Sequence, residues 1–77
     1  MGKPALSVSL GRVIRASREK LELSQEQLAE AAKLHPTYIG MVERADRNIT
    51  VLRLAQIAKA LGVTASSLLV EAEGKRR

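Results

Sequence analysis

The sequence predicts an all-α fold, a compact domain of five short helices. Apolar residues recur at three- and four-residue intervals along most of the 77 residues, and this spacing places them on one face of an α-helix. A Ser, Thr or Pro helix-start signal precedes or opens each of these stretches. No stretch alternates with the period of a strand, and no internal repeat occurs. We expect one domain over residues 1–77, with its core at about 9–72 and a flexible basic tail at 73–77.

The first two helices are predicted from apolar spacing and from serine caps. The first is expected from about Leu10 to Leu21, with Ser9 as its N-cap. The second is expected from Gln25 to Lys33, opened by Ser24, which forms a Ser-x-x-Gln capping box with Gln27. Small residues on the second helix allow a neighbouring helix to cross closely. The expected buried stripes are Leu10, Val13, Ile14, Ser17 and Leu21 in the first helix, and Leu28, Ala29 and Ala32 in the second.

The third helix is expected from about Pro36 to Glu43, with Ile39 and Val42 facing inward. Proline suits the first helical position, and its ring pushes the preceding residue, His35, toward extended geometry. A glycine inside this helix, Gly40, costs about 1 kcal/mol relative to alanine. We therefore expect another part of the chain to approach this helix closely.

The last two helices follow a polar loop. Thr50 caps the fourth helix, Val51 to Leu61, and Gly62 supplies a left-handed stop at its end. Thr64 caps the fifth helix, Ala65 to about Ala72. The expected inward residues are Leu54, Ala55, Ile57, Ala58 and Leu61 in the fourth helix, and Leu68 and Leu69 in the fifth.

Composition favours a polyanionic partner and argues against several other classes of protein. Thirteen Lys and Arg outnumber eight Asp and Glu, giving a net charge of +5 and an isoelectric point near 10.3, which favours nucleic acid. There is no cysteine, so we expect a reducing, cytoplasmic location and no thiolate metal site. Neither a membrane-spanning run nor the apolar core of a signal peptide occurs.

Catalysis and cofactor binding are not expected. The serines lack a plausible general base. His35 is the lone histidine and has no second metal-ligating neighbour, so we interpret it as a helix cap or as a neighbour of a phosphate. We expect no metal, no cofactor and no small-molecule ligand.

The second and third helices, joined by a tight turn, form a helix-turn-helix unit, whose second helix can lie in the major groove of DNA. Three motifs, LSQEQLAEAA, TYIGMVERADRNIT and LAQIAKALGVTASSLL, occur in this order between about Leu10 and Leu69. They resemble the XRE-type, phage-repressor and Cro-like (lambda-repressor-like) DNA-binding domains. The run TYI-x-x-x-ER-x-x-RN-I most resembles the controller proteins of restriction–modification systems. This resemblance implies a transcriptional regulator that binds a pseudo-palindromic double-stranded DNA operator as a homodimer.

The resemblance also implies roles for individual residues. Gln25 matches a glutamine that contacts a phosphate and braces the recognition helix, and Arg18 and Glu43 match a structural ion pair between the first and third helices. Thr37 and Tyr38 match positions that contact bases or the adjoining backbone. The DNA-binding residues expected on this basis are Ser24, Gln25, Pro36, Thr37, Tyr38, Met41, Arg44, Arg47 and Asn48.

Pro36 departs from the family pattern, because controllers often carry a polar residue there. Proline has no side-chain donor, so a bidentate contact to guanine is impossible at that position. Base reading would then depend on the shape of the DNA or on four side chains. These are Thr37, Tyr38, Met41 and Arg44.

Each candidate also has a purely structural interpretation. Gln25, Arg44 and Arg47 could be ordinary solvated residues. Tyr38 could be a core ring, although its position about 100° from Ile39 around the helix predicts at least partial exposure. Met41 could face the groove or fill a gap in the core.

Dimerisation is expected through the fifth helix and its approach, Val63 to Val70, with Val63, Leu68 and Leu69 at the interface. The two adjacent leucines cannot both point inward, which leaves one for a partner subunit. A two-fold dimer reads half-sites about 34 Å apart, or a multiple of this distance. Two alternatives are an antitoxin that represses its own operon and a helical protein-interaction module that does not bind DNA.

Overall fold

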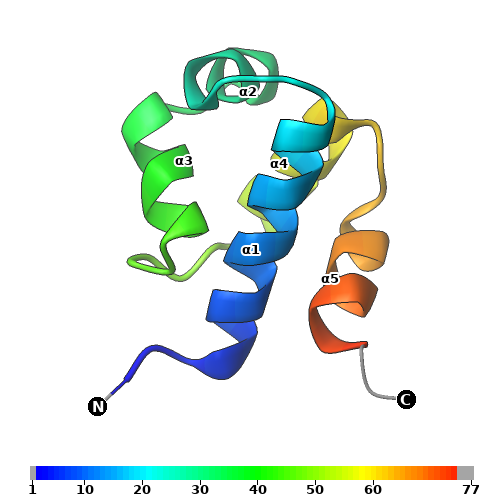
Figure 1. Ribbon diagram of the computed structural model, residues 1–77. Coiled ribbons are helices and arrows are strands. Elements are labelled where there is room, and N and C mark those ends of the chain that lie inside the picture. The colour runs from blue at the N-terminus through cyan, green and yellow to red at the C-terminus, as the bar shows by residue number, and fades with distance from the viewer. Residues whose placement is uncertain (1, 75–77) are drawn as a thin grey trace.

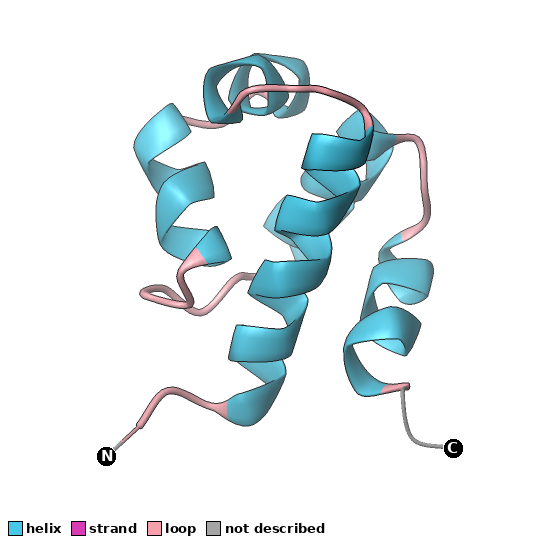
Figure 2. Ribbon diagram, in the orientation of Figure 1, coloured by secondary structure: helices cyan, strands magenta, loops and turns pink. Residues whose placement is uncertain are grey.

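The structure is a computed structural model that describes residues 2–74, and within this range all regular structure is helical (Figures 1 and 2). The all-α, five-helix prediction is therefore confirmed. The third and fourth helices have the predicted bounds. The helices are α1 (Ala5–Lys20), α2 (Gln25–Ala32), α3 (Pro36–Glu43), α4 (Val51–Leu61) and α5 (Ala65–Glu73).

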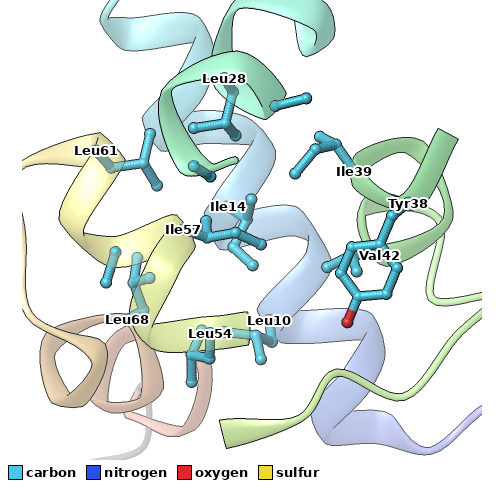
Figure 3. Packing of buried hydrophobic residues seen from close by; sticks show 13 residues of the cluster. Leu10, Ile14, Leu28, Tyr38, Ile39, Val42, Leu54, Ile57, Leu61 and Leu68 are labelled. Carbon is cyan, nitrogen blue, oxygen red and sulfur yellow. The ribbon is translucent and has the colours of Figure 1, made fainter. Parts of the chain in front are cut away.

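The core lies where all five helices meet. The helix α1 packs against α3 and α5, while α2 packs against α3 and α4, so that α1 and α4 lie between α3 and α5 in Figure 1. Each helix contributes one large side chain that is fully buried (Figure 3). Burying an aliphatic side chain of this size stabilises a fold by about 1.5–3 kcal/mol. These five side chains are Ile14, Leu28, Ile39, Ile57 and Leu68.

The predicted caps define most helix ends. The Ser24 hydroxyl accepts from the Gln27 backbone N–H at 2.9 Å, and the Gln27 side chain accepts from the Ser24 backbone N–H at 2.8 Å, which confirms the capping box. Thr50 and Thr64 accept in the same way from residues three positions later. Gly62 ends α4 with φ of 77°, a conformation that glycine adopts without steric cost.

The predicted start of α1 is wrong. The helix begins at Ala5 rather than Leu10, and Ser9 lies inside it and does not cap it. The residue before the helix is Pro4, whose φ of −58° and ψ of 137° leave the chain extended immediately before the first turn. Because the Pro4 carbonyl accepts the first helical hydrogen bond from Val8 at 3.1 Å, the five extra residues join the helix without a side-chain cap.

Three smaller expectations also differ from the structure. Ala55 was expected to face inward but is exposed on α4, and Leu21 follows α1 and is half exposed rather than buried. The helix α5 ends at Glu73, one residue past its expected end near Ala72, so the first residue of the predicted tail is helical. Most of that tail, residues 75–77, lies outside the described residues.

Within the described residues, no single helix is long and apolar enough to cross a membrane. The helices α4 and α5 reach that length and hydropathy only together, across a bend of 100°.

Candidate nucleic-acid interface

The helices α2 and α3 form a helix-turn-helix unit on one side of the molecule (Figure 1). Between them Lys33 adopts the left-handed conformation, with φ of 62°, and the Leu34 N–H bonds to the Ala29 carbonyl at 2.9 Å. Ala29 is buried, and its small side chain permits close contact at this crossing. The helix α3 packs against α1 and α2.

A buried ion pair ties the end of α3 to α1. Arg18 Nε donates to Glu43 Oε2 at 2.6 Å, and Arg18 Nη2 donates to Glu43 Oε1 at 3.1 Å. The two side chains are only 10% and 3% exposed. Hydrogen bonding to Glu43 raises the pKa of Arg18 above its ordinary value, against the opposing effect of burial. A third donor, Arg18 Nη1, bonds to the Leu23 carbonyl at 2.7 Å, which also fixes the chain that enters α2.

Gln25 lies at the start of α2 and braces α3. Its Nε2 donates to Glu43 Oε1 at 3.0 Å. A β-carbon at Gly40 would lie 3.6–3.7 Å from the Gln25 amide and 3.1 Å from Arg44 Nη1. The close approach expected at Gly40 therefore comes from these two side chains.

Gly11 sets the distance between α1 and α3. A β-carbon there would lie 2.6 Å from the Val42 carbonyl oxygen and 2.7 Å from that of Glu43, so the two helix backbones are in direct contact. Sequence reasoning overlooked this residue. The available signal was a glycine in the middle of an apolar helical stripe, where it costs about 1 kcal/mol relative to alanine.

The expected exposure of Tyr38 is wrong. Its side chain is only 9% exposed and lies in the core cluster beside Val42 (Figure 3), because α3 is covered over a wider sector than the spacing of Ile39 and Val42 indicated. Arg47 and Arg53 place their guanidinium carbons 5.9 and 5.2 Å from the centre of the ring. Among residues 2–74, the buried hydroxyl has no hydrogen-bond partner. A contact between Tyr38 and DNA requires this ring to leave the position that it occupies here.

The remaining candidates on α2 and α3 lie at the surface. Thr37 is exposed, and Pro36 and Met41 are partly exposed. Ser24 is exposed, but its hydroxyl is engaged in the capping box. A shallow pocket separates the starts of the two helices, whose N–H groups and dipoles both favour an anion there. Its lining consists of Arg18, Ser24, Gln25, Glu26, Pro36 and Thr37.

The loop after α3 presents the other candidate phosphate contacts. Arg44, Arg47 and Asn48 are all exposed. Arg44 Nε bonds to Asp46 Oδ2 at 3.0 Å. Arg53, at the start of α4, is exposed beside this loop and was missed by the sequence analysis because it lies outside the helix-turn-helix unit.

The three residues expected at the dimer interface differ in how far they are exposed to solvent. Leu68 is 2% exposed in the core of its own chain, so its assignment to a subunit interface is wrong. Leu69 is partly buried and Val63 is exposed. The most exposed large apolar side chains are instead Val51 and Leu52, at 80% and 77%. Sequence reasoning overlooked the signal for this surface, which is the pair of apolar residues that opens α4.

Residues 2–74 contain no cluster of three or more His, Cys, Asp or Glu side chains that could hold a metal ion.

Comparison with known proteins gives consistent matches. The family model described as "Helix-turn-helix" matches residues 14–68. Control protein C.SmaI of Serratia marcescens is 50% identical over 60 residues, which is 78% of this chain and 71% of that protein. Among solved structures, the restriction–modification controller protein C.AhdI of Aeromonas hydrophila has a TM-score of 0.79 at 35% identity, covering 80% of this chain and 94% of that one. The clp gene regulator ClgR of C. glutamicum has a TM-score of 0.85 at 31% identity, covering 97% of both chains.

Proposed function

This chain belongs to the helix-turn-helix family and is a DNA-binding transcriptional regulator, and we propose that it is the controller protein of a restriction–modification system. The observation that carries the proposal is the 50% identity to Control protein C.SmaI across 78% of the chain. Similarity to C.AhdI supports it. We propose further that the chain acts as a single DNA-binding domain in the bacterial cytoplasm, where its operator would be accessible.

The proposed DNA complex places the exposed side of α3 in the major groove. Thr37, Met41 and Arg44 would read base edges there, because they lie on the uncovered side of the helix. Pro36 opens the helix without a donor, so it contributes shape rather than a hydrogen bond. Contacts to phosphates from the starts of α2 and α3, and from the loop after α3, would supply most of the affinity.

The proposed homodimer uses an apolar surface formed by Leu6, Val51, Leu52 and Leu69. These residues come from α1, α4 and α5, and all but Leu52 line one shallow pocket that also includes Asn48. Dimerisation there would bring the two copies of the phosphate-contacting loop together near the two-fold axis. Two recognition helices could then bind adjacent half-sites about 34 Å apart.

Selection from random duplexes tests the DNA-binding proposal. Enrichment of a pseudo-palindrome supports a regulator, whereas no enrichment supports the interaction-module alternative. Thr37→Ala should weaken binding to the selected site more than to unrelated DNA. Arg47→Ala should weaken both alike and lower the slope of log affinity against log salt by about one.

Sedimentation equilibrium tests the dimer. Leu52→Lys should give a folded monomer, because this side chain is outside the core. The matched control is Val70→Lys, an exposed valine that lines a separate cleft with Leu21 and Val63, and it should remain dimeric. A strict wild-type monomer at tens of micromolar, with and without DNA, would reject dimerisation. Dissociation by the Val70 variant alone would place the interface on the other cleft.

The regulatory context needs a separate test, because ClgR has the same fold but is described as a regulator of clp genes. Mapping bound sites across the genome of the source organism would decide it. Binding upstream of restriction and modification genes supports the controller proposal. Binding at a toxin operon supports the antitoxin alternative.

A further inference from the structure

The N-terminal segment contacts the loop that follows the recognition helix. Lys3 Nζ donates to the Arg44 carbonyl oxygen at 2.6 Å and to Asp46 Oδ1 at 2.8 Å. Four residues later, in the first turn of α1, the Ser7 hydroxyl lies 3.4 Å from Asn48 Oδ1. We propose that Lys3 is a positioning residue for DNA binding, acting through Arg44 and Asp46. This inference rests on the proposed function, since it concerns Arg44, which is assigned there to reading base edges.

Lys3 supplies a charge that α3 itself lacks. The helix has no basic residue in its last turn, and Arg44 is its C-cap. The last carbonyl groups of a helix have no partner within the helix and carry partial negative charge. The Lys3 ammonium group, 41 residues away in sequence, bonds to one of these carbonyls. It therefore caps the recognition helix from outside.

The same ammonium group also orients the Arg44 side chain. One oxygen of Asp46 accepts from Lys3, and the other accepts from Arg44 Nε. The loop is further defined by Ala45, which has φ of 61°, and by a bond from the Asp46 N–H to the Met41 carbonyl at 2.7 Å. Without Lys3, the Asp46 carboxylate would lose one of its two partners, and the Arg44 guanidinium would have a less rigid anchor.

A direct contact between Lys3 and a DNA phosphate is the competing explanation. Lys3 Nζ already has two acceptors, and the Asp46 carboxylate lies beside it and would repel a phosphate. Both side chains of the Lys3–Asp46 pair are nearly half exposed, so the pair adds little to stability. Its effect should therefore appear in DNA binding and in loop order.

The test compares Lys3→Met with Lys59→Met on the duplex selected for the wild type. Lys59 is an exposed lysine on α4, so both variants lose one positive charge. Lys3→Met should bind about fivefold more weakly than the control, the ratio that corresponds to a stronger exposed ion pair, with the same salt slope. Lys3→Arg should restore most of the affinity. In the Asp46→Asn background, Lys3→Met should weaken binding by a smaller factor than in wild type, because only the contact with the Arg44 carbonyl then remains to be lost.

Equal affinity of the Lys3 and Lys59 variants would overturn the inference. A salt slope reduced by about one would also overturn it in favour of direct phosphate contact, as would multiplicative effects of Lys3 and Asp46. Amide hydrogen exchange in free protein gives a readout independent of DNA: Lys3→Met should accelerate exchange at Ala45 and Asp46, and unchanged exchange would count against it. Failure of the wild type to select any palindrome would instead reject the proposed function.

Discussion

Removing the Arg18 guanidinium should destabilise the domain far more than removing an exposed arginine from the same helix. In Arg18→Met the apolar stem is kept, but Glu43, which is 3% exposed, retains from the described residues only the donor of Gln25. Breaking a buried ion pair on one side costs about 3–5 kcal/mol. Because small domains are stable by about 5–15 kcal/mol in total, this is a large fraction of the free energy of unfolding.

Urea unfolding followed by circular dichroism measures this difference. The matched control is Arg15→Met, which makes the same substitution in α1 and breaks the exposed pair with Glu19. An exposed pair contributes about 0–1 kcal/mol, so the Arg15 variant should unfold near the wild-type midpoint. If the two variants differed by less than about 1 kcal/mol in free energy of unfolding, the argument that the Arg18 pair is buried and essential would fail.

The double variant Arg18→Met, Glu43→Leu separates stability from positioning. Replacing a buried ion pair by apolar residues of similar volume is often neutral or stabilising, so most of the lost free energy of unfolding should return. Operator affinity should remain low, because Gln25 has then lost its acceptor on α3 and Leu23 its side-chain donor. Recovery of wild-type operator affinity would refute a positioning role for the pair.

Three further variants test other features of the structure. Gly11→Ala should lower the free energy of unfolding, because its methyl group would lie 2.6 Å from a carbonyl oxygen. The resulting strain, about 1–3 kcal/mol, exceeds the gain in helix propensity. A urea midpoint at or above that of the wild type would contradict this prediction. Tyr38→Phe should raise the free energy of unfolding by about 1 kcal/mol, since the buried hydroxyl has no partner in the described part of the chain, and a lower urea midpoint would show that the hydroxyl is satisfied. The hydrogen bond from Lys3, and to a lesser extent the one from Arg44, lowers the pKa of the Asp46 carboxyl group. This carboxylate therefore stabilises the fold at pH values above its unfolded-state pKa, and the stabilisation is lost as the pH falls through its folded-state pKa. Asp46→Asn should therefore lose less stability than wild type between about pH 5 and pH 2, and an identical loss would contradict the shift.

Local signals account for what could be predicted from the sequence. The caps at Ser24, Thr50 and Thr64 depend only on residues within one turn, and all three form the expected hydrogen bonds. The start of α1 was misplaced because Ser9 has the side chain of a cap but lies in a run that is helical from Ala5. Residue type alone does not distinguish these two environments.

Tertiary contacts account for what could not be predicted. The spacing of α3 gives one inward direction, yet the helix is covered over a sector wide enough to bury Tyr38. Gly11 looks like an ordinary helical glycine until the backbone of α3 is placed against it. The contact of Lys3 with Arg44 joins residues far apart in sequence, and no periodic pattern indicates such a pairing.

The braces of α3 are separate from two of the side chains proposed to read DNA, those of Thr37 and Met41. A helix of eight residues is marginal alone, so its orientation depends on the crossing at Gly11 and on the ion pair of Glu43. Thr37 is exposed and Met41 partly exposed, and neither side chain belongs to the network of Arg18, Glu43 and Gln25 that braces α3. Substitutions at these two positions should therefore change the sequence chosen in duplex selection while leaving the urea midpoint within the range typical of surface residues, about ±0.5 kcal/mol. A selected sequence that stayed the same in both variants would mean that α3 reads DNA through its shape or backbone rather than through these side chains.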